Sequence, residues 1–206
     1  MVLGRNMILD EYKPKLNDPI FLGFLPKTIV IPDHNFLPAH VKQICSVSRC
    51  LSKRPPSMFS SDKAWVYNNA GLYNDMESPL GRDILLEDRD KYQIFAYKAY
   101  SIELDKNGIH EIDILRKIPG DLHAINPNPD LIGFYMIGHD IIQGINYLSF
   151  GCSPLSCNGL ANEFEVNEFC LIDDLKYAIM AGMRFEEVGA EPSPYYIFEV
   201  YKYKGI

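Results

Sequence analysis

Several chemical signatures are missing from this sequence of 206 residues. It contains no G-x-G-x-x-G fingerprint, no Walker lysine loop, no H-E-x-x-H zinc motif and no EF-hand calcium loop. It also has no apolar run near the roughly 18 to 20 residues that cross a bilayer, and its first residues are not typical of a secretory signal peptide. These absences argue against the common nucleotide, metal and membrane functions.

Cysteine is sparse and odd in number. Five thiols in a chain of this size fit reduced cysteines better than a disulfide framework, which predicts a cytoplasmic location. Cys45–Cys50 and Cys152–Cys157 share a C-x₄-C spacing that zinc sites tolerate. On the helix expected around Cys45, however, positions five apart leave the axis roughly 140° apart. We therefore predict no metal and no cofactor.

Charge is distributed unevenly along the chain. Residues 1–127 hold 16 acidic and 16 basic side chains, whereas the rest hold 11 acidic and 4 basic ones and so carry the whole net charge of −7. A field of that sign repels nucleic acid and anionic lipid, and it attracts cationic partners. An excess of acid also keeps a protein soluble without any partner.

The chain shows no internal repeat, heptad run or low-complexity segment, and it predicts a single domain over 1–206. Alternating or continuous apolar runs predict strands in six regions. The Asn-Gly pair at 107–108 predicts a hairpin turn. These regions are 20–31, 92–104, 109–115, 131–138, 168–172 and 194–203. The first is split by Pro26 and is expected at a sheet edge, and residues 143–166 are expected to form a loop.

Two segments have the apolar periodicity of helices. The first is 38–56, with Pro38 in its first turn and a proline pair at its end. The second begins at a cap on Asp173 or Asp174 and stops at Gly189. The predicted fold class is α+β, a mainly antiparallel sheet with two principal helices packed on one face.

One candidate chemistry is a thiol nucleophile. Cys152 or Cys157 would attack, His139 would act as its base, and Asp140 would orient the histidine. No known nucleophile context surrounds either cysteine. The alternatives are a reversible disulfide between the two thiols and a compact loop of small side chains that bond local backbone groups.

A second candidate is a protein-binding surface. Carboxylates in the last third of the chain would steer a partner with a basic surface, and aromatic side chains would anchor it. We therefore predict a non-catalytic acidic binding domain, an immunity-type or regulatory interaction protein, with the thiol-dependent enzyme as the alternative. The residues predicted to bind the partner are Glu163, Glu165, Glu168, Asp173, Asp174, Trp65, Tyr195 and Tyr201.

The aromatic stretch 65–75 supports a weaker third hypothesis. Trp65, Tyr67, Asn68 and Asn69 could contact a carbohydrate through ring faces and amide groups. The same alternation is typical of a half-buried strand. In the last predicted strand, both faces are apolar, which predicts that a further layer or a partner covers the second face.

Overall fold

The computed structural model describes residues 18–48, 68, 70–77, 91–118, 125, 129–144 and 152–205. The strands are β1 (Ile20–Thr28), β2 (Tyr92–Ala99), β3 (Ile102–Asp105), β4 (Gly108–Glu111), β5 (Phe134–Gln143) and β6 (Tyr195–Tyr203). The helices are α2 (Ile114–Lys117), α3 (Pro154–Cys157), the 3₁₀ helix η5 (Leu160–Asn162) and α4 (Leu175–Val188).

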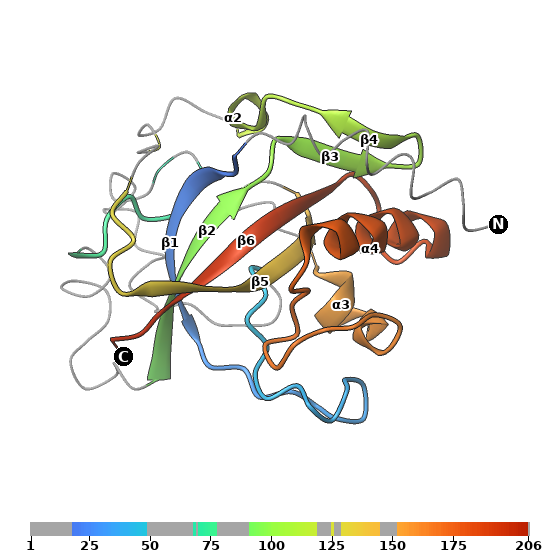
Figure 1. The fold of residues 1–206 in the computed structure, drawn as a ribbon, viewed down its shortest axis with the longest axis horizontal. Helices are drawn as coiled ribbons and strands as arrows, with labels where there is room; N and C mark the ends of the chain where they lie inside the picture. Colours follow the sequence, from blue (N-terminus) through green and yellow to red (C-terminus); the bar gives the residue numbers. More distant parts are fainter. Residues whose placement is uncertain are drawn as a thin grey trace.

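The strands form one antiparallel sheet with β6 at its centre (Figure 1). Its order is β1-β2-β6-β3-β4, and β5 pairs along the other edge of β6. Every residue from Tyr195 to Val200 is buried, since both faces of β6 are covered. The prediction of an α+β protein with a mainly antiparallel sheet is confirmed, as is the strand over 194–203.

Helix α4 covers one face of the sheet, where Phe185 and Ala178 share a buried cluster with Ile197 of β6. Its predicted ends are confirmed. The Asp174 side chain accepts a hydrogen bond from the backbone N–H of Tyr177, and Gly189 ends the helix with a φ of 62°. These are the usual capping devices of an isolated amphipathic helix, so the sequence was sufficient to locate it.

The prediction of a second principal helix over 38–56 is wrong for residues 38–48, and residues 49–56 lie outside the described ranges. Residues 41–48 contain no helix; Val41 and Ile44 belong to the buried cluster of α4, and Cys45 and Val47 belong to the cluster on the opposite face. Their N–H groups bond elsewhere: Lys42 and Gln43 donate to the Glu168 carbonyl, and Cys45 donates to the Phe169 carbonyl. Tertiary hydrogen bonds therefore override an apolar spacing that a helix would also satisfy. Within the described ranges, α4 is the one helix longer than four residues.

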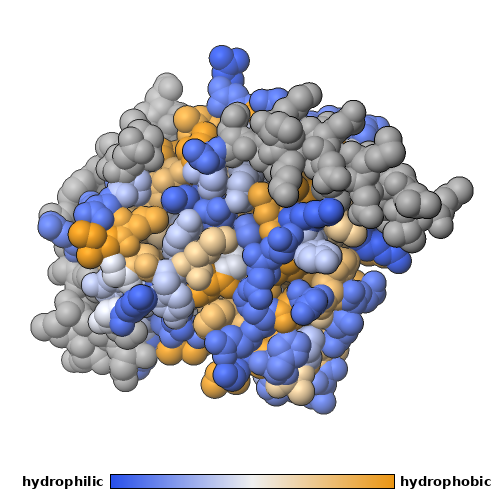
Figure 2. All heavy atoms as spheres, in the orientation of Figure 1, coloured by the Kyte–Doolittle hydropathy of each residue, from blue (hydrophilic) through white to orange (hydrophobic). Residues whose placement is uncertain are grey.

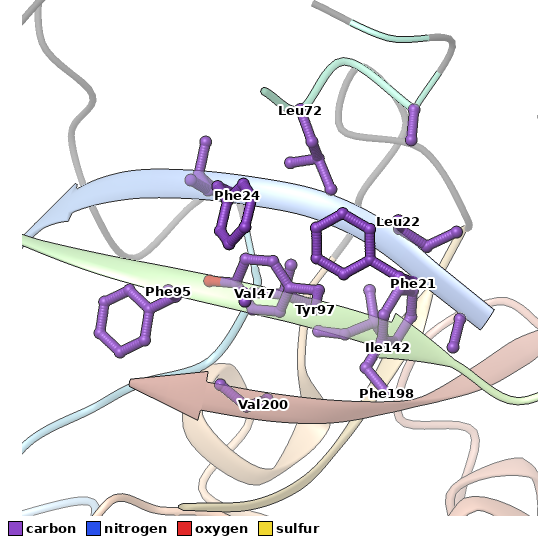
Figure 3. Packing of buried hydrophobic residues seen from close by; sticks show 14 of the residues in the cluster. Phe21, Leu22, Phe24, Val47, Leu72, Phe95, Tyr97, Ile142, Phe198 and Val200 are labelled. Atoms are coloured by element: carbon purple, nitrogen blue, oxygen red, sulfur yellow. The ribbon is translucent and has the colours of Figure 1, made fainter. Parts of the chain in front are cut away.

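The opposite face of the sheet holds the larger buried cluster (Figure 3). Tyr97, Val200 and Ile142 come from the neighbouring strands β2, β6 and β5, and Val47 of the 41–48 segment packs against them. The second layer expected over the last strand is thus supplied by the chain itself, by α4 on one face and by this segment on the other.

Several predicted boundaries differ from the structure. The segment 20–31 contains one edge strand, β1, which includes Pro26. The strand predicted over 131–138 begins and ends later in the chain, as β5 (Phe134–Gln143). The hairpin turn is confirmed between β3 and β4, but a kink separates β3 from β2. The strand predicted over 168–172 is a turn in which only Ile172 forms a β-bridge. A one-turn helix and a 3₁₀ helix interrupt the predicted loop over 143–166.

The prediction that the chain has no internal repeat is wrong. The Asn68 amide closes a turn: its Oδ1 accepts from the N–H groups of Ala70 and Leu72 at 2.9 and 3.2 Å, and its Nδ2 donates to the Leu22 carbonyl at 2.6 Å. Beside Leu22, the register of β1 shifts between Phe21 and Gly23. A short bridge between Phe24 and Tyr73 then fixes this turn to the outer edge of β1.

The same construction recurs with Asn167 on β5. Its Oδ1 accepts from Phe169 and Leu171 at 2.9 and 3.2 Å, and its Nδ2 donates to the Ile137 carbonyl at 2.7 Å. The register shift, the bridge and the left-handed residue in the turn have exact counterparts. The register of β5 shifts between Met136 and Gly138, and the bridge joins His139 to Ile172. The left-handed residue is Cys170 (φ 59°), where the first turn has Gly71 (φ 71°).

Strand pairing extends this correspondence to the sheet centre. Gly23 pairs with Tyr97 of β2, and Gly138 pairs with Val200 of β6. Tyr97 and Val200 also pair with each other. If the Asn68 turn and its strands are exchanged with the Asn167 turn and its strands, Tyr97 takes the place of Val200 and Val200 that of Tyr97. The central pair is therefore unchanged, which is the pattern of a two-fold axis. We call β1, the Asn68 turn and β2 the first copy, and β5, the Asn167 turn and β6 the second copy.

The two glycines give a test of this construction. Gly138 has a φ of 136°, and a Cβ there would lie 2.8 Å from the Leu171 Cβ. We expect Gly138→Ala to lower the free energy of unfolding by about 2–4 kcal/mol through backbone strain and overpacking. Gly108→Ala is the matched control, because Gly108 has a φ of 121° but nothing within 4 Å of an added Cβ. Urea unfolding would measure both; equal losses would contradict the close packing of the turn on β5.

Candidate functional site

Asp140 of β5 is a fully buried carboxylate. Its Oδ2 accepts from Ser46 Oγ at 2.7 Å and from the Val47 N–H at 2.8 Å, and its Oδ1 accepts from Ser153 Oγ at 2.8 Å. Lys27 lies nearby and donates to the carbonyl groups of Ser46 and Ser48. Asp140 therefore joins the 41–48 segment and the start of α3 to the sheet.

The environment acts on the protonation of Asp140 in two directions. Burial raises its pKa, while the hydrogen bonds from Ser46 and Ser153 and the charge of Lys27 oppose this rise. Every contact of the carboxylate is with a donor, so the group is suited to hold structure together. Its geometry offers no reactive oxygen to a substrate.

His139 lies on the opposite face of β5, because successive side chains of a strand alternate. Its Nδ1 donates to the Ile172 carbonyl at 3.1 Å, and its ring lies 6.1 Å from that of Tyr100. Across the strand pair, Glu199 accepts from the hydroxyl groups of Tyr100 and Tyr201, each at 2.7 Å. Burial lowers the pKa of His139, which favours the neutral imidazole.

These positions separate the members of the thiol-enzyme hypothesis. Asp140 bonds to serines on one face while His139 lies beside Tyr100 on the other, so the carboxylate does not orient the histidine. Cys152 and Cys157 are half-buried, and Cys157 Sγ lies 3.6 Å from Ser48 Oγ. The catalytic reading thus gains no support from this geometry.

The remaining described thiols are buried. Burial raises the pKa of Cys45 and of Cys170 to about 12, so both are protonated at neutral pH. Cys50 lies outside the described residues. Across the described ranges, no three His, Cys, Asp or Glu side chains are arranged to hold a metal ion. Nor does any helix there reach the length and hydrophobicity that a membrane span requires.

The predicted partner-binding carboxylates lie between η5 and α4. Glu163, Glu165, Asp173 and Asp174 are exposed, and the half-buried Glu168 pairs with Lys42 at 2.6 Å. Hydrophilic side chains gather over this region and α4, at the lower right of the view (Figure 2). All five residues therefore belong to the one stretch of chain that leads from η5 to α4.

The predicted aromatic residues do not share that stretch. Tyr195 is fully buried, with its hydroxyl donating to the Glu191 carbonyl, so it is a core residue and not a surface anchor. Tyr201 is half-buried beside Glu199, with the Lys98 ammonium 5.2 Å from its ring centroid. Trp65 lies outside the described residues.

The carbohydrate hypothesis loses Asn68, whose amide is buried and used inside its own turn. Trp65, Tyr67 and Asn69 lie outside the described residues. The feature that sequence reasoning missed is the repeat itself, visible as Asn, Leu and Asp shared at the same spacing by 68–75 and 167–174.

The repeat shows where the second copy departs from the first. At three positions that are buried in both copies, an apolar residue of the first copy is replaced by a polar one in the second, although the same backbone surrounds them. The replacements are His139 for Phe24, Asp140 for Leu25 and Glu199 for Ala96. Buried polar groups cost free energy unless they are bonded, so this asymmetry sets the second copy apart from the first.

Comparison with known proteins gives no relative: no protein-family model, no curated protein and no solved structure matches this chain.

The Asp140 contacts predict a large effect on stability. We expect Asp140→Asn to lower the free energy of unfolding by about 2–4 kcal/mol, because the new NH₂ group would face serine and backbone donors. Asp130→Asn is the control, since the exposed Asp130 accepts only from the Ile132 N–H, which an Asn oxygen can replace. Chemical unfolding at pH 7 measures both, and equal stabilities would contradict a structural role for Asp140.

The buried His139 predicts an acid-dependent loss of stability. Its pKa is lowered from 6.5 in the folded state, so its contribution is complete above pH 6.5 and is lost as pH falls below that value. We expect a slope of at most about 1.4 kcal/mol per pH unit. His139→Phe copies Phe24 and should flatten this slope between pH 7 and 5, whereas His34→Gln, at an exposed site, should not. Parallel curves for wild type and His139→Phe would exclude this assignment.

Proposed function

We propose that this chain is a non-catalytic protein-binding domain that recognises a partner with a basic surface. Immunity-type and regulatory interaction proteins are the class we have in mind. The observation that carries the proposal is the set of exposed carboxylates on the segment between η5 and α4. Glu163, Glu165, Asp173 and Asp174 form no ion pair within the described part of the chain.

Electrostatics explains how such a surface would work. The residues from 128 onward carry the net charge of −7, so the field on that part of the chain attracts cations and repels nucleic acid. Exposed charges of this kind mainly raise the association rate and select the partner, and salt screens them. A binding strength that falls with ionic strength is therefore part of the proposal.

The arrangement of buried groups favours binding over catalysis. The polar side chains of the second copy, Asp140, His139 and Glu199, are occupied by contacts within the chain. A catalytic base and its nucleophile need to reach one reacting atom, and His139 and Asp140 lie on opposite faces of β5. We further propose a cytoplasmic location, from the small and odd number of cysteines in the sequence.

A charge-reversal experiment tests this function. The double variant Glu163→Lys/Glu165→Lys should weaken binding to the captured basic partner by about tenfold or more at low salt. Glu77→Lys/Glu111→Lys makes the same change of charge at exposed sites in the first part of the chain and should bind within about twofold of wild type. Affinity capture from the producing cells, followed by titration of the purified partner at two salt concentrations, gives both numbers.

Three results would count against the proposal: capture of no basic protein at low salt, equal weakening by both double variants, or a dissociation constant indifferent to ionic strength. Cys152→Ser/Cys157→Ser should leave binding unchanged, and a loss of function in that variant would favour the thiol-enzyme alternative.

A further inference from the structure

A groove of about 350 Å³ lies where the Asn167 turn meets the start of β5. Gly138 and the apolar side chains of Met136 and Phe169 are among the residues that line it. Among the described residues, the carboxylates of Glu168 and Asp173 line it and no lysine or arginine does. The Lys202 ammonium lies outside the lining, 5.3 Å from the centroid of the Phe169 ring. The groove adjoins the exposed carboxylates of the proposed binding surface, because Asp173 belongs to both.

The first copy serves as an internal control for this groove. Its counterpart of Met136 is Phe21, which is 1% exposed and packs edge-on against Phe24, whereas Met136 is 40% exposed. The counterpart of the partly exposed Phe169 is the fully buried Ala70. The same backbone construction is thus closed by an apolar side chain in one copy and left open in the other.

The two copies also differ in charge, because the second copy has Asp173 where the first has Asn74. Asp173 Oδ1 accepts from Asn167 Nδ2 at 2.6 Å, and in the first copy Asn74 Oδ1 accepts from Asn68 Nδ2 at 3.1 Å. A neutral amide therefore suffices for the turn, and the negative charge at Asp173 is not required by the fold. Glu168 is paired with Lys42, which leaves Asp173 as the groove carboxylate without a cationic partner in the described ranges.

We propose that this groove takes a short segment of the basic partner in which an apolar side chain is followed by a lysine or arginine. The apolar side chain would lie against Met136 and Phe169, and the cation would face Asp173. Apolar burial supplies contact area and the carboxylate selects the charge, so the pair discriminates better than either alone. The inference rests on the proposed function and adds to it the chemistry of the docked segment.

Defined peptides test the groove without the partner. The probe is acetyl-Gly-Leu-Lys-Gly-amide, and its controls replace Leu by Ser or Lys by Gln. Titration followed by ¹H–¹⁵N NMR should shift the amide resonances of Gly138 and of residues 167–173 for the probe. Each control peptide should bind about fivefold more weakly, the order expected for losing one partly exposed charge contact or one apolar side chain.

Two variants separate the groove from general charge attraction. Asp173→Asn keeps the acceptor for Asn167, as Asn74 does in the first copy, and should weaken the lysine probe about fivefold while removing the preference for lysine over glutamine. Glu163→Gln removes one charge outside the groove and should change binding by less than about twofold. Unfolding midpoints of both variants confirm that each is folded.

The outcomes distinguish this inference from the proposed function. Absence of shifts at the groove amides, or equal weakening by Asp173→Asn and Glu163→Gln, would overturn the groove even if a basic partner is captured. Peptide binding with the expected preferences would support the groove even if the charge-reversal experiment finds no partner, in which case the proposed function fails by itself.

Discussion

Two asparagine amides determine how this sheet is built. Each amide satisfies the backbone of its own turn and reaches across to a carbonyl of an edge strand, Asn68 to Leu22 and Asn167 to Ile137. A carboxamide can do this because it is donor and acceptor at once. The turn then lies so close to the strand that the residue beside it, Gly23 or Gly138, has no room for a side chain. Edge strands that would otherwise expose unpaired groups are covered in this way.

Repeating that construction about a two-fold axis gives a symmetric backbone scaffold, but the side chains of the two copies differ. The first copy is apolar where the second buries His139, Asp140 and Glu199. Each of these groups is bonded within the chain, so their cost is offset. Asp140 alone among them also specifies how α3 and the 41–48 segment attach. The second copy is thereby tied to α3 and to the 41–48 segment. The first copy also bonds to that segment, through Lys27 of β1, and its edge is closed by aromatic packing.

The surface follows the same division. The second copy carries the open groove and Asp173, and the exposed carboxylates that precede α4 continue from it. A duplicated scaffold lets one half maintain the fold while the other accepts side chains that folding does not require. This is why we assign recognition to the second copy, and why the proposed partner is defined by its charge and by one apolar side chain beside a cation.

The sequence by itself determined the elements whose instructions are local. The Asp174 cap and Gly189 bound α4, the Asn-Gly pair makes the β3–β4 turn, and aromatic alternation marks β6. Only the tertiary structure decided that 41–48 is extended, because its N–H groups bond to the distant Glu168 and Phe169. It also decided that His139 and Asp140 face opposite layers and that two dissimilar stretches are copies. Such features depend on contacts between residues far apart in the chain, and local patterns carry no record of those contacts.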